Sequence, residues 1–379
     1  MDILIVSPFY NESPQRKSGL IRLTKEMSKY PKVNITVISS RVEGAKKVEE
    51  INSHLKIYRF RPTLYMPNLP YIFDLFQLLK ILRVCKKEQC DVIVGYSLQF
   101  FSCFCAAVSS VLLKRPFICR IVGESKTTKF GYLDFFSDIY DSVFGHLTLK
   151  LSDKILVQSK NMQKRPLELG TDPNKISIVA DGIYPDTFKN KRDHAKIRRN
   201  IGIQNSKVIV SFISRLFKQK GVKDLLLIAN QLSHDNKDIL FLIAGRGSLE
   251  KKVERESKLS ENILYLGFRN DVPDLLSISD IFILPSYTEG LSPAILEALA
   301  SGVPVITTKV GANLDVLKDK VNGYIISAGK TEEMKEAILQ LAKRESLRKK
   351  MGDQNVQKVI ESFNIKNVAR KFIEELLSL

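Results

Sequence analysis

Short apolar runs alternate with longer amphipathic segments along this chain, and this alternation restricts the fold more than any other feature. In the first half, the apolar runs lie at residues 3–7, 34–39, 91–95, 117–122 and 154–158. A second series follows at residues 207–214, 239–244, 262–266, 281–284 and 303–307. Short apolar strands separated by helical segments are typical of parallel sheets with crossover helices. The sequence therefore predicts an α/β protein with two doubly wound, Rossmann-like sheets.

The length of 379 residues also favours two domains, because a single core rarely grows that large. We predict an N-terminal Rossmann-like domain over 1–185, a linker over 186–205 and a C-terminal Rossmann-like domain over 206–360. Segment 331–379 is helical in pattern throughout, and a last helix over 361–379 is expected to pack back on the N-terminal domain. Open α/β sheets bind ligands at the carboxyl ends of their strands, so we expect the two domains to face each other across a ligand-binding cleft.

The formal charge of +18 is spread along the chain. Residues 1–190 hold 28 basic and 18 acidic side chains, a net +10, which leaves +8 for the remainder. Such a charge favours anionic partners, which include nucleic acid, a membrane surface and phosphorylated small molecules. The alternative interpretation is a basic surface that is simply solvated. Because the basic residues are not concentrated among aromatic ones and no nucleic-acid-binding module is recognisable, we expect no nucleic-acid partner.

Five cysteines lie among apolar residues in the first third of the chain, and we predict that they are reduced core thiols. The first residues match a strand and lack the pattern of a signal peptide, which predicts a cytoplasmic protein. The apolar stretch 100–113 is shorter than the ~20 residues that cross a bilayer, so a buried helix is expected there.

Cations follow the first strand of the second series. The run from Arg215 to Gly221 places Arg215, Lys218 and Lys220 before a glycine where a strand is expected to meet a helix. Backbone N–H groups at a helix start, an Arg fork and a Lys point charge together neutralise a diphosphate. Solvent-exposed side chains are the other interpretation of this pattern.

The stretch 286–306 is the most informative part of the chain. A strand is expected to end at Leu284 and a helix to begin near Ser292 or Pro293, since proline suits the first helical turn. Glu289 then lies in the loop before the helix, and Glu297 lies within the helix. Carboxylates bind pairs of hydroxyl groups and helix-start amides bind anions, a combination that suits a nucleotide sugar. Spacing alone also fits two surface acids.

Glu289 and Glu297 with seven residues between them, the Arg215–Gly221 run and the segment 300–306 resemble the retaining glycosyltransferases of family 4, the group 1 glycosyltransferases with the GT-B fold. Residues 244–247, 266–268 and 322–323 match the same family in order and spacing. The resemblance spans 206–325 and extends less distinctly toward both ends.

The resemblance implies a role for each matching residue. Arg215 and Lys220 hold the donor diphosphate and offset charge on the leaving nucleotide, an electrostatic stabilisation of the transition state. Glu297 binds the ribose hydroxyls, and Glu289 binds the donor sugar. The remaining donor-binding residues implied in the C-terminal domain are Gly245, Gly247, Phe268, Arg269, Leu291, Ser292, Pro293 and Ala294.

The N-terminal domain matches the family less well. Gly19 corresponds to one of the family's paired glycines near the donor phosphates, and Lys17 would add a cation there. The other interpretation of this segment is a plain polar loop. No histidine occupies the usual acceptor-side position, so Glu124 or the donor phosphate is expected to accept the acceptor proton. Ala312 and Asp315 replace a family glycine and glutamate.

The donor site is expected to need no metal, since the chain has no Asp-x-Asp motif and Arg215 with Lys220 supplies the counter-charge. The donor substrate is expected to be a UDP- or GDP-sugar. Residues 63–87 combine apolar residues with Arg83, Lys86 and Lys87, which fits either a core-facing helix or peripheral contact with an anionic membrane and a lipid-linked acceptor.

The sequence thus predicts a retaining hexosyltransferase that acts on a glycan or lipid-linked acceptor in cell-surface polysaccharide or glycolipid synthesis, at the inner face of the membrane. The alternatives are a sugar-nucleotide epimerase or phosphorylase on the same fold, a basic nucleic-acid-binding protein, or an inactive scaffold subunit. We expect Glu297→Ala and Lys220→Ala to abolish stabilisation by the donor while the melting temperature of the free protein hardly changes.

Overall fold

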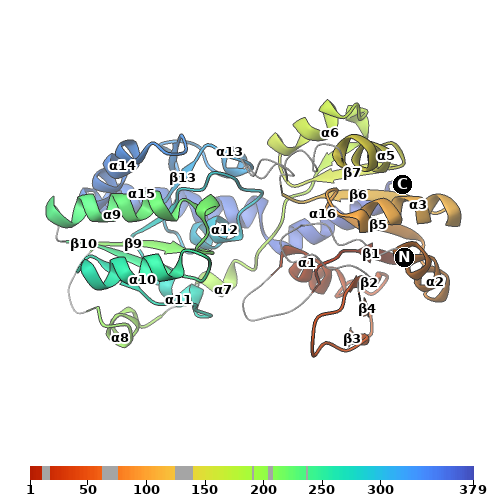
Figure 1. Cartoon of the computed structure of the whole chain (residues 1–379), viewed down its shortest axis with the longest axis horizontal. Helices are drawn as coiled ribbons and strands as arrows, with labels where there is room; N and C mark the ends of the chain where they lie inside the picture. The colour runs from red at the N-terminus through yellow and green to blue at the C-terminus, as the bar shows by residue number, and fades with distance from the viewer. Residues whose placement is uncertain (11–17, 62–75, 124–139, 190–191, 204–207, 236–237) are drawn as a thin grey trace. The chain divides into compact units, whose positions relative to one another are not determined.

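The computed structural model describes the chain except for residues 11–17, 62–75, 124–139, 190–191, 204–207 and 236–237 (Figure 1). The chain divides into two compact units. The first unit consists of Met1–Gly182 together with Ile365–Leu379, and the second consists of Ile183–Asn364. The chain thus passes from the first unit to the second and returns at its end.

The first unit is built on an eight-stranded sheet in the order β3-β4-β2-β1-β5-β6-β7-β8. All neighbouring strands are parallel except β3 and β4, which form an antiparallel hairpin at one edge. The strands are β1 (Asp2–Val6), β2 (Asn34–Ser40), β3 (Val48–Asn52), β4 (Leu55–Phe60), β5 (Val92–Tyr96), β6 (Phe117–Ile121), β7 (Lys154–Val157) and β8 (Ile176–Ile178).

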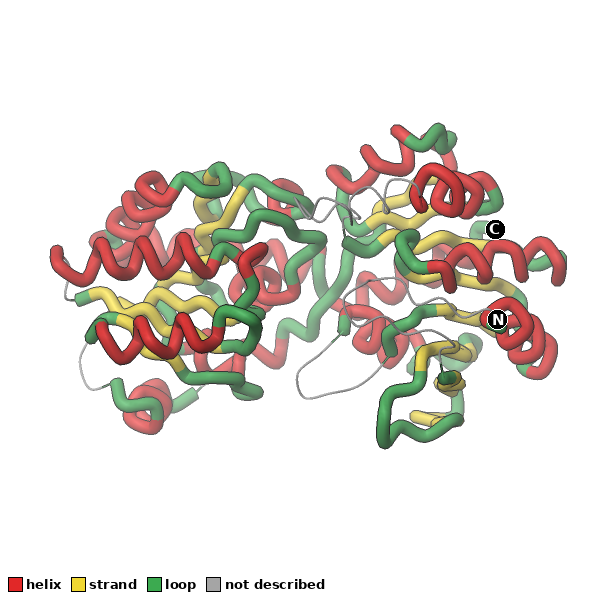
Figure 2. The backbone as a smooth tube through the Cα atoms, viewed as in Figure 1, coloured by secondary structure: helices red, strands yellow, loops and turns green. Residues whose placement is uncertain are grey.

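Helices cover both faces of this sheet (Figure 2). The connection from β1 to β2 moves one way along the sheet and that from β5 to β6 moves the other way, so right-handed crossovers place α1 (Gly19–Met27) and α3 (Phe101–Leu113) on opposite faces. With α3 lie α2 (Gln77–Lys87) and α5 (His146–Lys150), over one apolar core. The other helical elements in the described part of the unit are η1 (Asp141–Gly145), η2 (Asn161–Gln163), α6 (Lys164–Glu168), η3 (Pro173–Lys175) and α16 (Ile365–Leu377).

The second unit has six parallel strands in the order β11-β10-β9-β12-β13-β14. They are β9 (Val208–Ile213), β10 (Ile239–Ala244), β11 (Ile263–Tyr265), β12 (Ile281–Leu284), β13 (Val305–Thr308) and β14 (Gly323–Ile326). The helical elements are α7 (Asp186–Lys189), α8 (His194–Asn200), η4 (Lys218–Lys220), α9 (Val222–Asp235), α10 (Glu250–Leu259), α11 (Val272–Ser277), α12 (Pro293–Ala300), α13 (Asn313–Val316), α14 (Thr331–Lys343) and α15 (Glu345–Ser362).

The direction of the second sheet reverses between β9 and β12. Strands β10 and β11 follow β9 toward one edge, whereas β13 and β14 follow β12 toward the other. The loops that leave the carboxyl ends of β9 and β12 therefore diverge, and this topological switch point is where open α/β sheets bind ligands.

All ten strands expected from the apolar runs form, with ends that differ from the expected ones by at most two residues. The sequence analysis missed β3, β4, β8 and β14. Strand β3 is largely exposed, and β8 has only three residues, all half-buried, so neither has the continuous apolar run that marks a buried strand.

The structure differs from the expected domain limits at the linker. Residues 186–205, expected to be a linker, belong to the second unit, where Arg192 Nε donates to Asp274 Oδ1 of α11 at 2.7 Å. The segment expected to be helical, 331–379, forms three helices, and the last of them, α16, returns to the first unit and packs on α1. Gly182 and Ile183, where the chain leaves the first unit, lie beside Phe363–Ile365, where it returns; Ile183 N–H donates to Phe363 O at 2.9 Å.

The five cysteines are free and buried, as predicted. Among the described residues, no helix combines the length and the apolar character that a membrane span requires. The expectation of a buried helix over 100–113 holds for one face only. Helix α3 buries its inner side chains against the sheet, but Val111 and Leu112 are more than half exposed.

Candidate functional site

A buried ion pair joins the two loops at the switch point of the second sheet. Lys220 Nζ donates to Glu289 Oε1 at 2.7 Å, and the two side chains are 11% and 5% exposed. Lys220 ends η4 after β9, and Glu289 lies between β12 and α12. A buried charge is tolerated only when it is paired and hydrogen-bonded, and here each partner satisfies the other.

Further bonds fix the two loops against each other. Tyr287 N–H donates to Gln219 O at 2.8 Å, and the Tyr287 hydroxyl donates to Asp224 Oδ2 at 2.7 Å. The hydrogen bond to Asp224 and, to a smaller extent, burial raise the pKa of Tyr287 to about 12. The Lys220–Glu289 pair is therefore the centre of a set of bonds between the loops.

Two glycines allow close packing against the loop after β12, one from the loop after β9 and one from the loop after β13. Gly221 has a φ of +71°, and a Cβ there would lie 1.9 Å from Pro285 O in the loop after β12. Gly311 has a φ of +53°, and its Cβ would lie 1.8 Å from Glu289 O. Both positions combine the left-handed backbone with contact against a carbonyl, so only glycine fits them.

Ser286 is a site residue that the sequence analysis missed. Its hydroxyl is fully buried and donates to Glu289 Oε1 at 2.7 Å, so Ser286 and Lys220 hold the same carboxylate oxygen. Thr308 Oγ1 donates to the Ser286 carbonyl oxygen and fixes the backbone of the loop. The position of Ser286, three residues before Glu289, was the only signal in the sequence.

Arg215 follows β9 and is exposed, with its guanidinium 5.5 Å from the centre of the Phe217 ring. The neighbouring backbone is held by Leu216, whose N–H donates to Arg246 O at 2.8 Å and whose carbonyl accepts from Leu249 N–H at 2.9 Å. Arg215 thus projects from a fixed loop at the same sheet edge as the ion pair.

Gly245 and Gly247 have a packing role that the sequence did not reveal. A Cβ on Gly245 would lie 1.9 Å from Ser214 O, and one on Gly247 would lie 2.5 Å from Leu216 O. Both glycines therefore let the loop after β10 pack against the loop that carries Arg215. That Gly245 and Gly247 also allow a donor to approach the backbone closely remains a prediction.

The third part of the site is the start of α12. Ser292 is its N-cap, and its side chain makes no capping hydrogen bond, while Pro293 occupies the first turn. Leu291 and Ser292 are buried, Pro293 is exposed, and Ala294 and Glu297 are half-buried. The first N–H groups of this helix thus have no side-chain cap, which leaves the positive end of the helix suited to an anion.

Phe268 and Arg269 follow β11 and are half-buried. The Arg269 guanidinium makes two bonds to Asp271, with Nε to Oδ1 at 2.8 Å and Nη2 to Oδ2 at 2.5 Å. The Asp271 carboxylate raises the pKa of Arg269, mainly through the hydrogen bond. Asp271 was not predicted; its two bonds hold the Arg269 guanidinium in place.

The candidates of the first unit do not form a comparable site in the described residues. Gly19 begins α1, and a Cβ there would lie 2.2 Å from Asp181 Oδ2, so this glycine makes room for a carboxylate of its own chain. Asp181 in turn accepts from the buried Arg120 at 3.2 Å. Glu124 and Lys17 lie outside the described residues.

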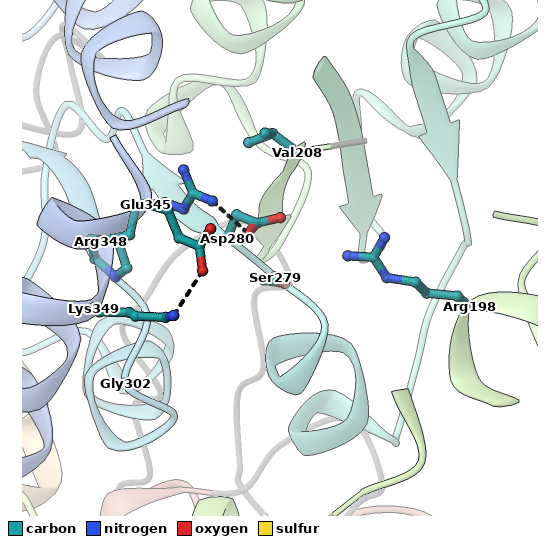
Figure 3. A pocket seen from close by; sticks show the side chains of 9 residues that line it. Arg198, Val208, Ser279, Asp280, Gly302, Glu345, Arg348 and Lys349 are labelled. Atoms are coloured by element: carbon teal, nitrogen blue, oxygen red, sulfur yellow. Dashed lines mark ion pairs between the residues drawn. The ribbon is translucent and has the colours of Figure 1, made fainter. Parts of the chain in front are cut away.

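A pocket of about 390 Å³ lies at the opposite, amino edge of the second sheet (Figure 3). Its charged side chains are largely paired with one another: Arg348 with Asp280 at 3.3 Å and Lys349 with Glu345 at 2.8 Å. Ligands of open α/β sheets bind at the carboxyl edge, so this pocket is not the candidate site. In the part of the chain that the structure describes, no three side chains of His, Cys, Asp or Glu gather as metal ligands.

Two family models match nearly the whole chain. The model for glycosyl transferases group 1 matches residues 193–358, and the model for glycosyltransferase family 4 matches residues 19–187. The two α/β units, each built on a mainly parallel sheet, together with these family models show the GT-B fold. The chain belongs to the group 1 glycosyltransferases of family 4.

Individual relatives are distant. The chain is 26% identical over 322 residues, 81% of its length and 80% of the relative's, to UDP-Gal:alpha-D-GlcNAc-diphosphoundecaprenol alpha-1,3-galactosyltransferase of Escherichia coli. It is 26% identical over 304 residues, 79% and 78% of the two chains, to N-acetyl-alpha-D-glucosaminyl L-malate synthase of Bacillus anthracis. The crystal structure of HepE of Anabaena in complex with UDP-glucose superimposes with a TM-score of 0.77 at 17% identity over the whole of both chains.

Proposed function

We propose that this glycosyltransferase moves a hexose-type sugar from a UDP- or GDP-sugar to a glycan or lipid-linked acceptor with retention of configuration. The relative from E. coli is named for a UDP-sugar donor and a diphosphoundecaprenol-linked acceptor, and a relative from Campylobacter jejuni is named for another diphosphoundecaprenol-linked acceptor. These names support cell-surface polysaccharide or glycolipid synthesis as the process. The inner face of the membrane is the place that we propose for it.

The observation that carries the proposal is the buried bond between Lys220 and Glu289 at the switch point. In the proposed complex the donor diphosphate lies beside Lys220 and Arg215, at the uncapped start of α12. Lysine has three N–H donors, so Lys220 can keep its bond to Glu289 and still donate to a phosphate oxygen. Two cations and a helix terminus then offset the charge that develops on the leaving nucleotide, which is why no metal is required in this proposal.

The two carboxylates have different proposed partners. Glu289, held by Ser286 and Lys220, is fixed in one position before the donor arrives and accepts hydrogen bonds from hydroxyls of the donor sugar. Glu297, on the half-buried face of α12, accepts from the ribose hydroxyls. Gly245, Gly247, Phe268 and Arg269 border the nucleoside in this arrangement.

The test is a panel of UDP- and GDP-sugars, assayed with EDTA present by thermal shift and by nucleotide release. A bound donor raises the melting temperature by mass action. We expect one class of nucleotide sugar to stabilise the wild type and Glu297→Ala to lose this response. The matched control is Glu333→Ala, which removes an exposed carboxylate from α14 of the same unit and should respond like the wild type. A normal response from Glu297→Ala would refute the assignment.

A further inference from the structure

A second pocket lies in the first unit, beside α1 and the hairpin of β3 and β4. Its volume is about 400 Å³, within the range of about 300–1,000 Å³ that small-molecule sites span. The lining residues come from α1, from both strands of the hairpin and from the segments that follow β1 and β2. Those two segments leave the carboxyl ends of their strands, the edge at which open α/β sheets bind ligands. None of the lining residues has a part in the proposed donor site.

The pocket contains a buried arginine at a position where a sheet usually presents an apolar side chain. Arg59 is 7% exposed and shares its face of β4 with Ile57, whereas Tyr58 points to the opposite face and its apolar core. Arginine is almost never fully buried unless it is paired. Here Nη1 of Arg59 lies 2.6 Å from Oε2 of the half-buried Glu49, which comes from the other strand of the hairpin.

The ion pair with Glu49 does not satisfy the whole guanidinium. Arg59 Nε is buried and has no hydrogen-bond partner among the described residues. Buried donors in proteins are nearly always hydrogen-bonded, because a buried donor without an acceptor destabilises the fold. Since Arg59 lines the pocket, an anion that enters the pocket is the acceptor that would satisfy this donor.

Charged side chains at the rim add both kinds of hydrogen-bonding group. Lys46 and Glu43 are exposed, line the pocket and form no ion pair within the described residues. The pocket at the amino edge of the second sheet differs, because its charged side chains are largely paired with one another (Figure 3). Lysine and arginine only donate hydrogen bonds, and a carboxylate only accepts them. A ligand that suits both kinds of group carries a negative charge and hydroxyl groups.

The loop that forms one wall of the pocket is fixed at both ends. Arg41 N–H donates to Phe60 O at 2.8 Å, and Arg59 N–H donates to Lys47 O at 2.7 Å, so the loop begins and ends on β4. Within the loop, Arg41 Nε donates to Ala45 O at 2.9 Å. This wall is therefore in place before a ligand binds, which lowers the entropic cost of binding.

We propose that this pocket binds a small hydroxylated anion, either a sugar phosphate or a sugar acid. The anionic group accepts hydrogen bonds from Arg59 and Lys46, and hydroxyl groups donate to Glu43. The apolar side chains of Val42 and Ile51, which are exposed in the same pocket, contact the carbon atoms of the sugar ring. The proposal goes beyond the transferase activity and does not depend on the donor site.

The experiment is isothermal titration calorimetry of the full chain with glucose 6-phosphate and with glucuronate, compared with inorganic phosphate and with neutral glucose. Arg59→Gln and Lys46→Ala remove the two proposed cations. The matched control is Lys47→Ala, because Lys47 is exposed next to Lys46 but does not line the pocket. Arg215→Ala, in the second unit, tests whether the anion binds at the donor site instead.

We expect at least one of the two sugar anions to bind more tightly than inorganic phosphate, and glucose not to bind. Affinity should fall at least about tenfold in Arg59→Gln, because hydrogen bonds from buried charged groups contribute most. It should fall about threefold in Lys46→Ala, because exposed charges contribute less. Lys47→Ala and Arg215→Ala should bind as the wild type does.

The proposal is overturned if neither sugar anion binds, or if neither binds more tightly than inorganic phosphate. Unchanged affinity in Lys46→Ala would also overturn it, and this exposed variant decides the matter if Arg59→Gln does not fold. Affinity lost in Arg215→Ala and kept in the pocket variants would place the anion at the donor site instead. Stabilisation by the nucleotide sugar should be unchanged in Lys46→Ala, so failure here is distinct from failure of the proposed function.

Discussion

Lys220 and Glu289, which are 69 residues apart in the chain, share a buried hydrogen bond of 2.7 Å at the point where the second sheet changes direction. The bond joins the loop after β9 to the loop after β12, and Ser286 donates to the same carboxylate oxygen. One interaction thus links the stability of the two loops to the position of the groups proposed to bind the donor.

The first prediction concerns stability. Lys220→Met should lower the free energy of unfolding by about 3 kcal/mol, because it leaves the Glu289 carboxylate buried without its cation. The expectation from sequence, that removing Lys220 hardly changes the melting temperature, does not fit this burial. The double variant Lys220→Met with Glu289→Leu should lose less than the sum of the single variants in urea unfolding.

The matched control for this cycle is Lys258→Met. Lys258 pairs with Glu254 at 2.9 Å, but both side chains are more than half exposed. Exposed pairs contribute little, so the control should change stability by less than about 1 kcal/mol. Equal losses at Lys220 and Lys258 would mean that the pair at the switch point is not desolvated.

Gly221→Ala tests the close approach of the two loops. A Cβ would meet Pro285 O at 1.9 Å, and φ is +71°, so we expect a loss of both stability and donor response. Gly202→Ala is the control, since Gly202 has a φ of +79° but no atom within 4 Å of its Cβ. This variant introduces the backbone strain without the steric clash, so its melting temperature should fall less than that of Gly221→Ala. Similar losses in the two variants would argue against contact between the loops.

Ser286→Ala tests the positioning of Glu289. The variant removes one of two donors to a buried carboxylate oxygen, and hydrogen bonds to charged groups contribute enough to expect about a tenfold fall in kcat. Donor binding through Arg215 and Glu297 should remain, so KM for the donor should change little. Ser286→Thr, which keeps the hydroxyl, should restore part of the rate. A rise in KM at constant kcat would contradict a positioning role.

The tyrosines of the second unit predict a change at high pH. Burial, followed by the hydrogen bond to Glu250, raises the pKa of Tyr265 to about 12. A raised pKa contributes stability that is fully present below the unfolded value of about 10 and is lost as pH rises from there through about 12. Absorbance of tyrosinate during alkaline titration should show a late-titrating group that is missing in Tyr265→Phe. Identical curves would show that the hydroxyl does not titrate late.

The sequence predicted the architecture well because buried parallel strands are continuous apolar runs, and ten of the fourteen strands in the described residues are of that kind or near it. It failed where burial is partial, as at the exposed β3, and where a charged segment was taken for a linker although it belongs to the second unit, as at residues 186–205. Helix α3 shows a further limit: its overall apolar character predicted burial, yet one side of it is exposed.

The motifs of the candidate site could be located in the sequence, but their contacts could not. Lys220 and Glu289 were assigned to two different parts of a donor, and only the fold shows that they bind each other. Gly245 and Gly247 were expected to face a ligand, whereas their missing side chains leave room for carbonyls of the loop that holds Arg215. A glycine that makes room for a neighbouring backbone and a glycine that makes room for a ligand cannot be told apart in the sequence.

The central claim is tested most directly by a crystal structure of the full chain with an intact UDP- or GDP-sugar, chosen from the thermal-shift panel. The account predicts the diphosphate within hydrogen-bonding distance of Lys220 Nζ and the Arg215 guanidinium, at the start of α12, with Glu289 on the sugar and Glu297 on the ribose. A nucleotide bound away from the carboxyl ends of β9 and β12, with the Lys220–Glu289 pair untouched, would contradict it.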